Sequence, residues 1–164
     1  MIDIQFAWND PEDARDAATF AGAVIGREPA YISHGEIQTG LSPDGKRWAD
    51  SLVELYAEDF ADPGGRDMVV GRDVDGKVRG FLILGWQESD RLKYAVIEDM
   101  AVDPELRSHG IGAHLVKLAE ERVRAADGVD WIFLESGLEN ESAHRFFERE
   151  GFDMTSHVFA RRLR

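Results

Sequence analysis

Residues 102–113 read Val-Asp-Pro-Glu-Leu-Arg-Ser-His-Gly-Ile-Gly-Ala, and they decide the fold because they join a strand pattern to a helix pattern. The apolar residues before them predict a buried strand over residues 93–102. After them, apolar residues recur at helical spacing to about residue 126. Glycines at such a junction leave backbone N–H groups free to point at an anion, and the helix dipole favours negative charge there. The junction therefore predicts a phosphate or pyrophosphate site, to which Arg107 adds a charge-assisted hydrogen bond.

The spacing of Arg107, Gly110 and Gly112 resembles the acyl-CoA pyrophosphate loop of the GCN5-related N-acetyltransferases. Residues 140–152, Asn-Glu-Ser-Ala-His-Arg-Phe-Phe-Glu-Arg-Glu-Gly-Phe, resemble the family's second cofactor segment, Asn-x-x-Ala-x-x-Phe-Tyr-x-x-x-Gly-Phe. With the strands before them and the tail, these segments extend the resemblance over about residues 66–163. The first 65 residues resemble the family only in the order of their predicted helices and strands. A Rossmann dinucleotide site is excluded because the third glycine and the acidic residue after the next strand are missing.

The whole chain, residues 1–164, is predicted to form a single N-acetyltransferase domain of the α/β class. Periodicity and turn signals predict, in chain order, a strand over 2–6, a helix over 11–25, a long loop over 26–45, a helix over 48–60, strands over 68–74, 78–84 and 93–102, the junction helix, a strand over 131–135, a helix over 140–150, and closing strands over 152–154 and 157–163. The resemblance implies a GNAT-like fold, in which a central mixed β-sheet of about six to seven strands is flanked by about four helices.

Composition narrows the classes of partner. The net charge of −13 argues against nucleic acid, which needs a basic surface. Acidic walls would attract a cationic amine. The alternative is that the negative charge is spread over the whole surface and keeps the protein soluble. The chain contains no cysteine, and its five histidines lack metal-ligand spacing, so we expect no metal. No apolar run reaches membrane-spanning length and no signal peptide is evident, so we expect no membrane partner and a cytoplasmic location.

The resemblance implies acetyl-CoA as co-substrate. The residues that it assigns to acetyl-CoA are Met100, Ala101, Val102, Arg107, Ser108, His109, Gly110, Ile111, Gly112, Ala113, Asn140 and Phe147. It also implies that the strand over 131–135 splays away from the strand that ends at Val102, to admit the cofactor. Asn140 is independently a good N-cap for the helix that follows it. Phe147 departs from the family pattern, which commonly has a tyrosine whose phenol protonates the departing thiolate.

Glu98 and Asp99 interrupt an otherwise apolar strand. A carboxylate that faces the interior is costly unless it is used or paired. Strict alternation places Glu98 on the same face as Met100 and Val102. In many similar acetyltransferases an acid at about this position accepts the proton of the substrate ammonium, so Glu98 is the catalytic candidate and Asp99 the second candidate. The alternative is an acid paired with an arginine of a neighbouring strand.

These residues predict an enzyme that moves an acetyl group from acetyl-CoA to a primary amine, on a small cationic molecule or a peptide N-terminus. A catalytically silent acyl-CoA-binding module of the same fold is the alternative that Phe147 favours. A toxin-type or protein-modifying acetyltransferase is the third possibility, and the negative charge argues against tRNA as its substrate. A homodimer is left open.

Overall fold

The computed structural model describes residues 2–164, and Met1 lies outside the described residues. One sheet has the strand order β1-β2-β3-β4-β5. Its strands are β1 (Gln5–Trp8), β2 (Arg66–Arg72), β3 (Val78–Glu88), β4 (Lys93–Val102) and β5 (Val129–Leu134). Strands β1 to β4 pair antiparallel, whereas β5 pairs parallel to β4, so the predicted mixed sheet is confirmed.

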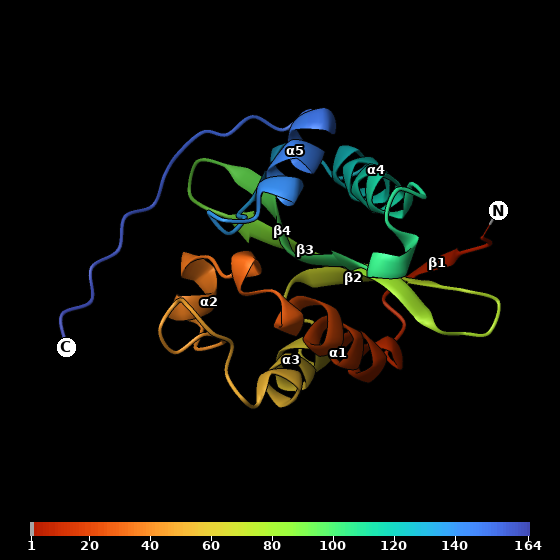
Figure 1. Cartoon of the computed structure of the whole chain (residues 1–164). Coiled ribbons are helices and arrows are strands. Elements are labelled where there is room, and N and C mark those ends of the chain that lie inside the picture. Colours follow the sequence, from red (N-terminus) through yellow and green to blue (C-terminus); the bar gives the residue numbers. More distant parts are fainter. Residues whose placement is uncertain (1) are drawn as a thin grey trace.

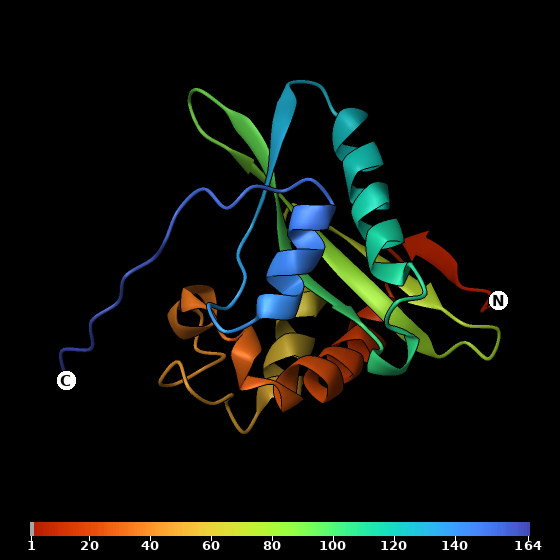
Figure 2. The same ribbon diagram turned by 45° about the horizontal axis from the view of Figure 1, so that its top comes forward.

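Helices cover both faces of the sheet, with α1 and α3 on one face and α4 and α5 on the other (Figures 1 and 2). The α-helices are α1 (Asp13–Val24), α2 (His34–Gln38), α3 (Leu52–Ala61), α4 (Ile111–Arg124) and α5 (Glu141–Arg149). Three short 3₁₀ turns are η1 (Ile25–Arg27), η2 (Pro29–Tyr31) and η3 (Pro104–Leu106). None of the helices in residues 2–164 has the length and apolar character needed to cross a membrane.

Strand β3 lies at the centre of the core. Phe81 and Ile83 belong to the apolar cluster under α1 and α3, whereas Leu82 and Leu84 belong to the cluster under α4. Because both faces of β3 are covered, its sequence reads as a continuous apolar run instead of an alternating one.

Two expectations about the number of elements are wrong. Within residues 2–164 the sheet has five strands instead of six to seven, because the closing strands expected over 152–154 and 157–163 do not form. There are five α-helices instead of about four, because α2 lies in the expected long loop. Helix α2 is started by a capping box, in which Glu36 accepts hydrogen bonds from the backbone N–H and the hydroxyl of Ser33. Five residues are too few for periodicity to reveal such a helix.

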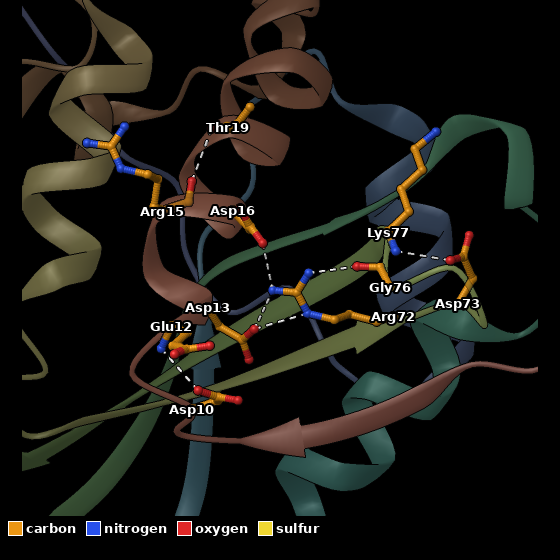
Figure 3. Close-up of polar contacts among 10 residues, drawn as sticks. All are labelled: Asp10, Glu12, Asp13, Arg15, Asp16, Thr19, Arg72, Asp73, Gly76 and Lys77. Carbon is orange, nitrogen blue, oxygen red and sulfur yellow. Dashed lines mark hydrogen bonds and ion pairs between the residues drawn. The ribbon is translucent and has the colours of Figure 1, made fainter.

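An ion-pair cluster fastens α1 to the sheet (Figure 3). The Arg72 guanidinium on β2 lies 2.5 Å from Asp13 Oδ1 and 2.9 Å from Asp16 Oδ2, both on α1. Arg72 also donates to the Gly76 carbonyl in the β2–β3 turn at 2.8 Å. Asp13 is only 5% exposed, and Arg72 supplies the cation that a carboxylate buried to this extent needs. The cluster holds the helix layer that forms one side of the candidate site.

Candidate active site

The strands β4 and β5 separate halfway along β4. Their pairing ends at Ile97 and Leu134, after which the chain leaves the sheet toward α5. In the described part of the chain, residues 98–102 of β4 therefore have no strand partner on the β5 side. A cavity of about 630 Å³ lies there, between β4, the junction loop, α5 and the helical segments α2 and α3.

The cavity brings together nearly all residues that the sequence proposed for catalysis and cofactor binding. It is lined by Glu98, Met100, Ala101, Val102, Arg107, Ser108, Gly110, Ile111, Gly112, Ala113, Asn140 and Phe147. His109 does not line it. The His109 Nδ1 lies 3.2 Å from the Leu106 carbonyl oxygen and 3.1 Å from that of Arg107, so this ring packs on its own loop.

The junction loop presents a helix N-terminus to the cavity. Gly110 is the N-cap of α4 and has a φ of +79°, a conformation that favours glycine. The first backbone N–H groups of a helix have no acceptor within the helix. Here His114 N is the first to bond back, to the Gly110 carbonyl, which leaves the N–H groups of residues 111–113 for an anion. The Arg107 guanidinium stands at the same edge and donates to the Tyr31 hydroxyl at 3.0 Å.

Gly112 serves packing. A Cβ at this position would lie 3.2 Å from the Phe146 ring and 3.5 Å from Met100 Cε. The missing side chain thus lets α4 approach α5 and β4 closely.

The polar groups on the α5 side suit a polar ligand arm. The Ser136 hydroxyl is buried and has no hydrogen-bond partner among residues 2–164. It lines the cavity together with Asn140. Asn140 Oδ1 accepts from Ala143 N at 3.3 Å, so its predicted role as N-cap of α5 is confirmed. The cavity thus combines a buried hydroxyl without a partner, an unpaired strand edge and a helix N-terminus. These groups suit the amide arm and the phosphates of acetyl-CoA.

A β-bulge decides which way the two acids of β4 point. Ile83 pairs with Asp99 and Leu84 pairs with Ile97, so Glu98 is the extra residue. A Cβ on Gly85 would lie 2.8 Å from the Glu98 carboxyl carbon, so Glu98 shares the α3 face with Gly85 and not the α4 face with Met100. The prediction from strict alternation is therefore wrong, because alternation does not survive an inserted residue.

Glu98 is held by an arginine from β2. Glu98 Oε2 lies 3.5 Å from the guanidinium of Arg66, which also lies 3.0 Å from Asp59 Oδ2. Burial raises the pKa of Glu98, while the charge of Arg66 opposes the rise. This is the arginine pairing that the sequence left open as the alternative, and it crosses β3 over Gly85.

Asp99 lacks such a partner: no arginine, lysine or histidine within residues 2–164 forms an ion pair with it. It lines the cavity beside Tyr56, Glu36 and Glu98. Burial, and then the negative charges of Asp59, Glu36 and Glu98, raise the pKa of Asp99 well above its ordinary value. Burial and the nearby Asp99 likewise raise the pKa of the Tyr56 phenol. A carboxyl with a raised pKa is better matched to a proton transfer near neutral pH.

The sequence did not identify Glu36 and Tyr56, which line the cavity, or Arg66, which contacts Glu98. Glu36 had a detectable signal, because Ser33-x-x-Glu36 is a capping box. Tyr56 was part of the apolar stripe of a predicted helix, and it is 1% exposed. No local sequence pattern identifies Arg66 as a residue near the candidate site. Separately, residues 2–164 contain no group of three His, Asp or Glu side chains arranged to hold a metal ion.

The mixed sheet, the separated parallel strands and the glycine-capped helix together define an α/β protein of acetyltransferase type. The sequence model of the Acetyltransferase (GNAT) family matches residues 35–152, so the chain belongs to that family. The resemblance seen in residues 102–113 and 140–152 is thereby confirmed.

Two curated relatives illustrate the range of the family. Aminoalkylphosphonate N-acetyltransferase of Salmonella typhimurium is 34% identical over 67 residues, which is 41% of this chain and 43% of the relative. Mycothiol acetyltransferase of Nocardiopsis dassonvillei is 28% identical over 141 residues, which is 80% of this chain and 41% of the relative. The chain thus spans less than half the length of these relatives.

Solved structures share the fold. The aminoglycoside N-acetyltransferase AAC(6')-Iy, solved in complex with CoA, has a TM-score of 0.66 at 14% identity. The alignment covers 100% of this chain and 97% of that one. At this identity the likeness supports the fold alone.

Proposed function

We propose that this protein transfers an acetyl group from acetyl-CoA to the primary amine of a small cationic molecule. The observation that carries the proposal is a single cavity that joins the N-terminus of α4 to the unpaired carboxyl of Asp99. An anion site and a proton acceptor in one cavity are what acetyl transfer from a phosphorylated thioester to an ammonium ion requires.

The cofactor half of the cavity would be used as follows. The N–H groups of residues 111–113 and the Arg107 guanidinium would hold the pyrophosphate. The free edge of Met100–Val102 would pair with the amides of the pantetheine arm, as an added strand does. The Ser136 hydroxyl, which lacks a partner within residues 2–164, would gain one. Acetyl-CoA supplies the activated acyl group as a thioester.

The acceptor half would bind and deprotonate the amine. Only the neutral amine is nucleophilic, so the ammonium must first lose a proton. We assign this proton to Asp99 instead of Glu98, because Arg66 neutralises Glu98 and leaves Asp99 unpaired. The neutral amine would then attack the thioester carbonyl, and backbone N–H groups near Met100–Val102 would stabilise the oxyanion. Collapse of that intermediate would release CoA.

The charge of the acceptor half supports a cationic substrate. Glu36, Glu98 and Asp99 all line the cavity, whereas Arg66 is already shared between Glu98 and Asp59. A cationic amine would relieve the repulsion among these carboxylates, which is the cause of part of the raised pKa of Asp99.

Phe147 keeps the silent acyl-CoA-binding module as the second candidate. Its ring packs edge-on against Phe146 and Phe152, with centroids 5.0 and 5.7 Å away, and it has no proton to donate to a departing thiolate. CoA thiolate is not a poor leaving group at neutral pH, so the absence of a phenol here is compatible with turnover.

Thiol release from acetyl-CoA tests the proposal. Polyamines and other small polycations would be compared with monoamines of equal length, whose only charge is the reacting ammonium, and with peptides that carry a free N-terminus. We expect the highest kcat/KM with a small polycation. Binding of CoA without thiol release from any acceptor would identify a silent module, and a preference for peptides would overturn the proposed substrate class.

A further inference from the structure

Arg79 on β3 joins two carboxylates that belong to different segments of the chain. Its Nε lies 2.7 Å from Asp73 Oδ2, at the start of the β2–β3 turn, and its Nη1 lies 2.8 Å from Asp103 Oδ2, directly after β4. The side chains of Asp73 and Asp103 are each only 10% exposed, and that of Arg79 is 20% exposed. Charge-assisted hydrogen bonds of this length fix the geometry of the groups that they join.

The β2–β3 turn holds the Asp73 carboxylate in place. Asp73 Oδ1 accepts hydrogen bonds from Asp75 N and from Lys77 N, each at 3.0 Å, and the bond from Lys77 is drawn in Figure 3. The other oxygen of the same carboxylate binds Arg79. The turn therefore keeps the Arg79 guanidinium in the orientation that reaches Asp103.

Asp103 opens the junction loop, residues 103–110, which leads to the proposed pyrophosphate site. Asp103 Oδ1 accepts from Glu105 N at 3.0 Å and so caps the short turn η3. The Asp103 N–H also donates to the Arg79 carbonyl at 2.8 Å. Arg107 follows η3 directly, as its C-cap. The position of Arg107 therefore depends on a turn that Arg79 and Asp103 hold against β3.

The other end of the loop rests on the next residue of β3. A Cβ on Gly80 would lie 3.2 Å from Ile111 Cγ2 and 3.4 Å from Leu115 Cδ1, so the missing side chain admits the first turns of α4. Ile111 and Leu115 are both buried. Arg79 and Gly80 thus support the two ends of the loop, the first through an ion pair and the second through close packing.

The loop between these two ends contains a residue in an unfavourable conformation. Ser108 has a φ of +69°, in the left-handed region that residues with a Cβ rarely occupy. Such a conformation persists only where the surrounding structure imposes it. Release of the end at Asp103 would let the loop relax. Arg107 would then move relative to the N–H groups of residues 111–113.

We propose that Arg79 is a positioning residue for acetyl-CoA, which sets the affinity for the pyrophosphate without touching it. Arg79 does not line the cavity, and it acts through Asp103, whose carboxylate fixes η3 and thereby Arg107. The inference rests on the proposed function, because the loop binds acetyl-CoA only under that proposal. It predicts that loss of the ion pair changes the KM for acetyl-CoA more than kcat or the KM for the amine.

Three variants separate the contacts, and a fourth is the matched control. Arg79→Met removes both ion pairs, whereas Arg79→Lys keeps the positive charge but lacks the fork that reaches two acids. Asp103→Asn keeps a cap for η3 and removes the charge that Arg79 binds. The control is Arg122→Met, because Arg122 pairs with Asp67 at 2.9 Å in the last turn of α4 and does not line the cavity.

Acetyl-CoA binding is measured by calorimetric titration, well below the melting temperature of every variant. We expect Arg79→Met to weaken binding at least about tenfold, within the usual range of about 5- to 150-fold by which one site changes the affinity of another. Addition of Asp103→Asn to Arg79→Met should weaken it no further, because both act through one contact. Arg122→Met should lower the melting temperature and leave the dissociation constant unchanged. If Arg79→Met does not fold, Arg79→Lys and Asp103→Asn carry the same comparison.

Hydrogen exchange of the ligand-free protein completes the test. Arg79→Met should speed the exchange of backbone amides within residues 105–110, and Arg122→Met should not. Unchanged exchange in this loop overturns the inference. So does an acetyl-CoA affinity that Arg79→Met leaves intact, or that Arg122→Met lowers equally, and in these cases the proposed function stands. A wild-type protein that binds no acetyl-CoA overturns the proposed function, and the inference with it.

Discussion

The substitution Asp99→Asn should lower activity and raise stability together. If Asp99 accepts the amine proton, its loss should reduce kcat/KM by about 10²–10⁴, the usual range for a general base. At 1.36 kcal/mol for each factor of ten, this is about 3–5 kcal/mol of transition-state stabilisation. Asparagine keeps the size of the side chain but removes a charge that burial and three neighbouring carboxylates oppose.

The sign of the stability change follows from proton linkage. Because the pKa of Asp99 is higher in the folded protein than in the unfolded chain, the folded state binds the proton more tightly. The free energy of unfolding therefore falls as pH rises from the ordinary pKa to the raised one, and the loss is complete above it. Asp99→Asn should melt at a higher temperature than wild type at pH 8, and the difference should shrink toward pH 4. Each 1 kcal/mol corresponds to about 2–4 °C in a chain of this size.

Glu98→Gln is the matched control, since it removes the same charge one residue away. Arg66 keeps its contact with Asp59 in this variant, so we expect less than a tenfold change in kcat/KM. Thiol release between pH 5.5 and 9 and calorimetric melts would be measured on both variants. If Asp99→Asn kept full activity while Glu98→Gln lost 10² or more, the assignment of the base to Asp99 would be refuted and Glu98 would be the base.

Further predictions concern the cofactor half of the cavity and one ion pair. Acetyl-CoA at 100 times its dissociation constant should stabilise the fold by about 2.7 kcal/mol in a thermal melt, and no shift at millimolar ligand would contradict the proposed site. Arg107→Ala should weaken acetyl-CoA binding roughly 10- to 100-fold by calorimetric titration, because a hydrogen bond from a charged group contributes about 1.5–3 kcal/mol. Phe147→Tyr should leave CoA binding intact and leave turnover unchanged or raised, and a large loss of thiol release would mean that the ring is packed too tightly for a hydroxyl. Asp67→Asn should destabilise the fold at pH 7 and less so at low pH, as measured by melts, because hydrogen bonds from Arg122, Trp86 and Asn9 outweigh burial and lower the pKa of Asp67.

The elements near the cofactor could be predicted from the sequence because their signals are local. The strand predicted over residues 93–102 coincides with β4, and the junction helix begins where Gly110 caps it. Turn glycines, N-caps and apolar periodicity each depend on a few neighbouring residues, so they remain readable without knowledge of the tertiary structure.

The features that could not be predicted from the sequence depend on pairing between residues that are far apart in the chain. The bulge at Glu98 is defined by how β4 pairs with β3. The apolar pattern of β4 alone does not reveal which residue is the inserted one. The pairing of Glu98 with Arg66 joins β4 to β2 across the intervening strand β3. The closing strands failed for a related reason: an alternating pattern specifies a strand only when a partner edge is in reach, and the tail leaves α5 in another direction.

The distribution of arginines sets Asp99 apart from Glu98, the other acid of β4 in the cavity, and this difference points to function. Several carboxylates of the described residues are each matched by an arginine: Asp13 and Asp16 by Arg72, Asp73 and Asp103 by Arg79, Asp67 by Arg122, and Asp59 and Glu98 by Arg66. Asp99 lines the cavity without an arginine partner among residues 2–164, as does Glu36 beside it, and burial raises the pKa of Asp99 well above its ordinary value. Stability alone would favour an asparagine there, as the raised pKa indicates. A local violation of this kind is expected where a residue serves chemistry instead of folding, and the missing cation is then the substrate's ammonium group.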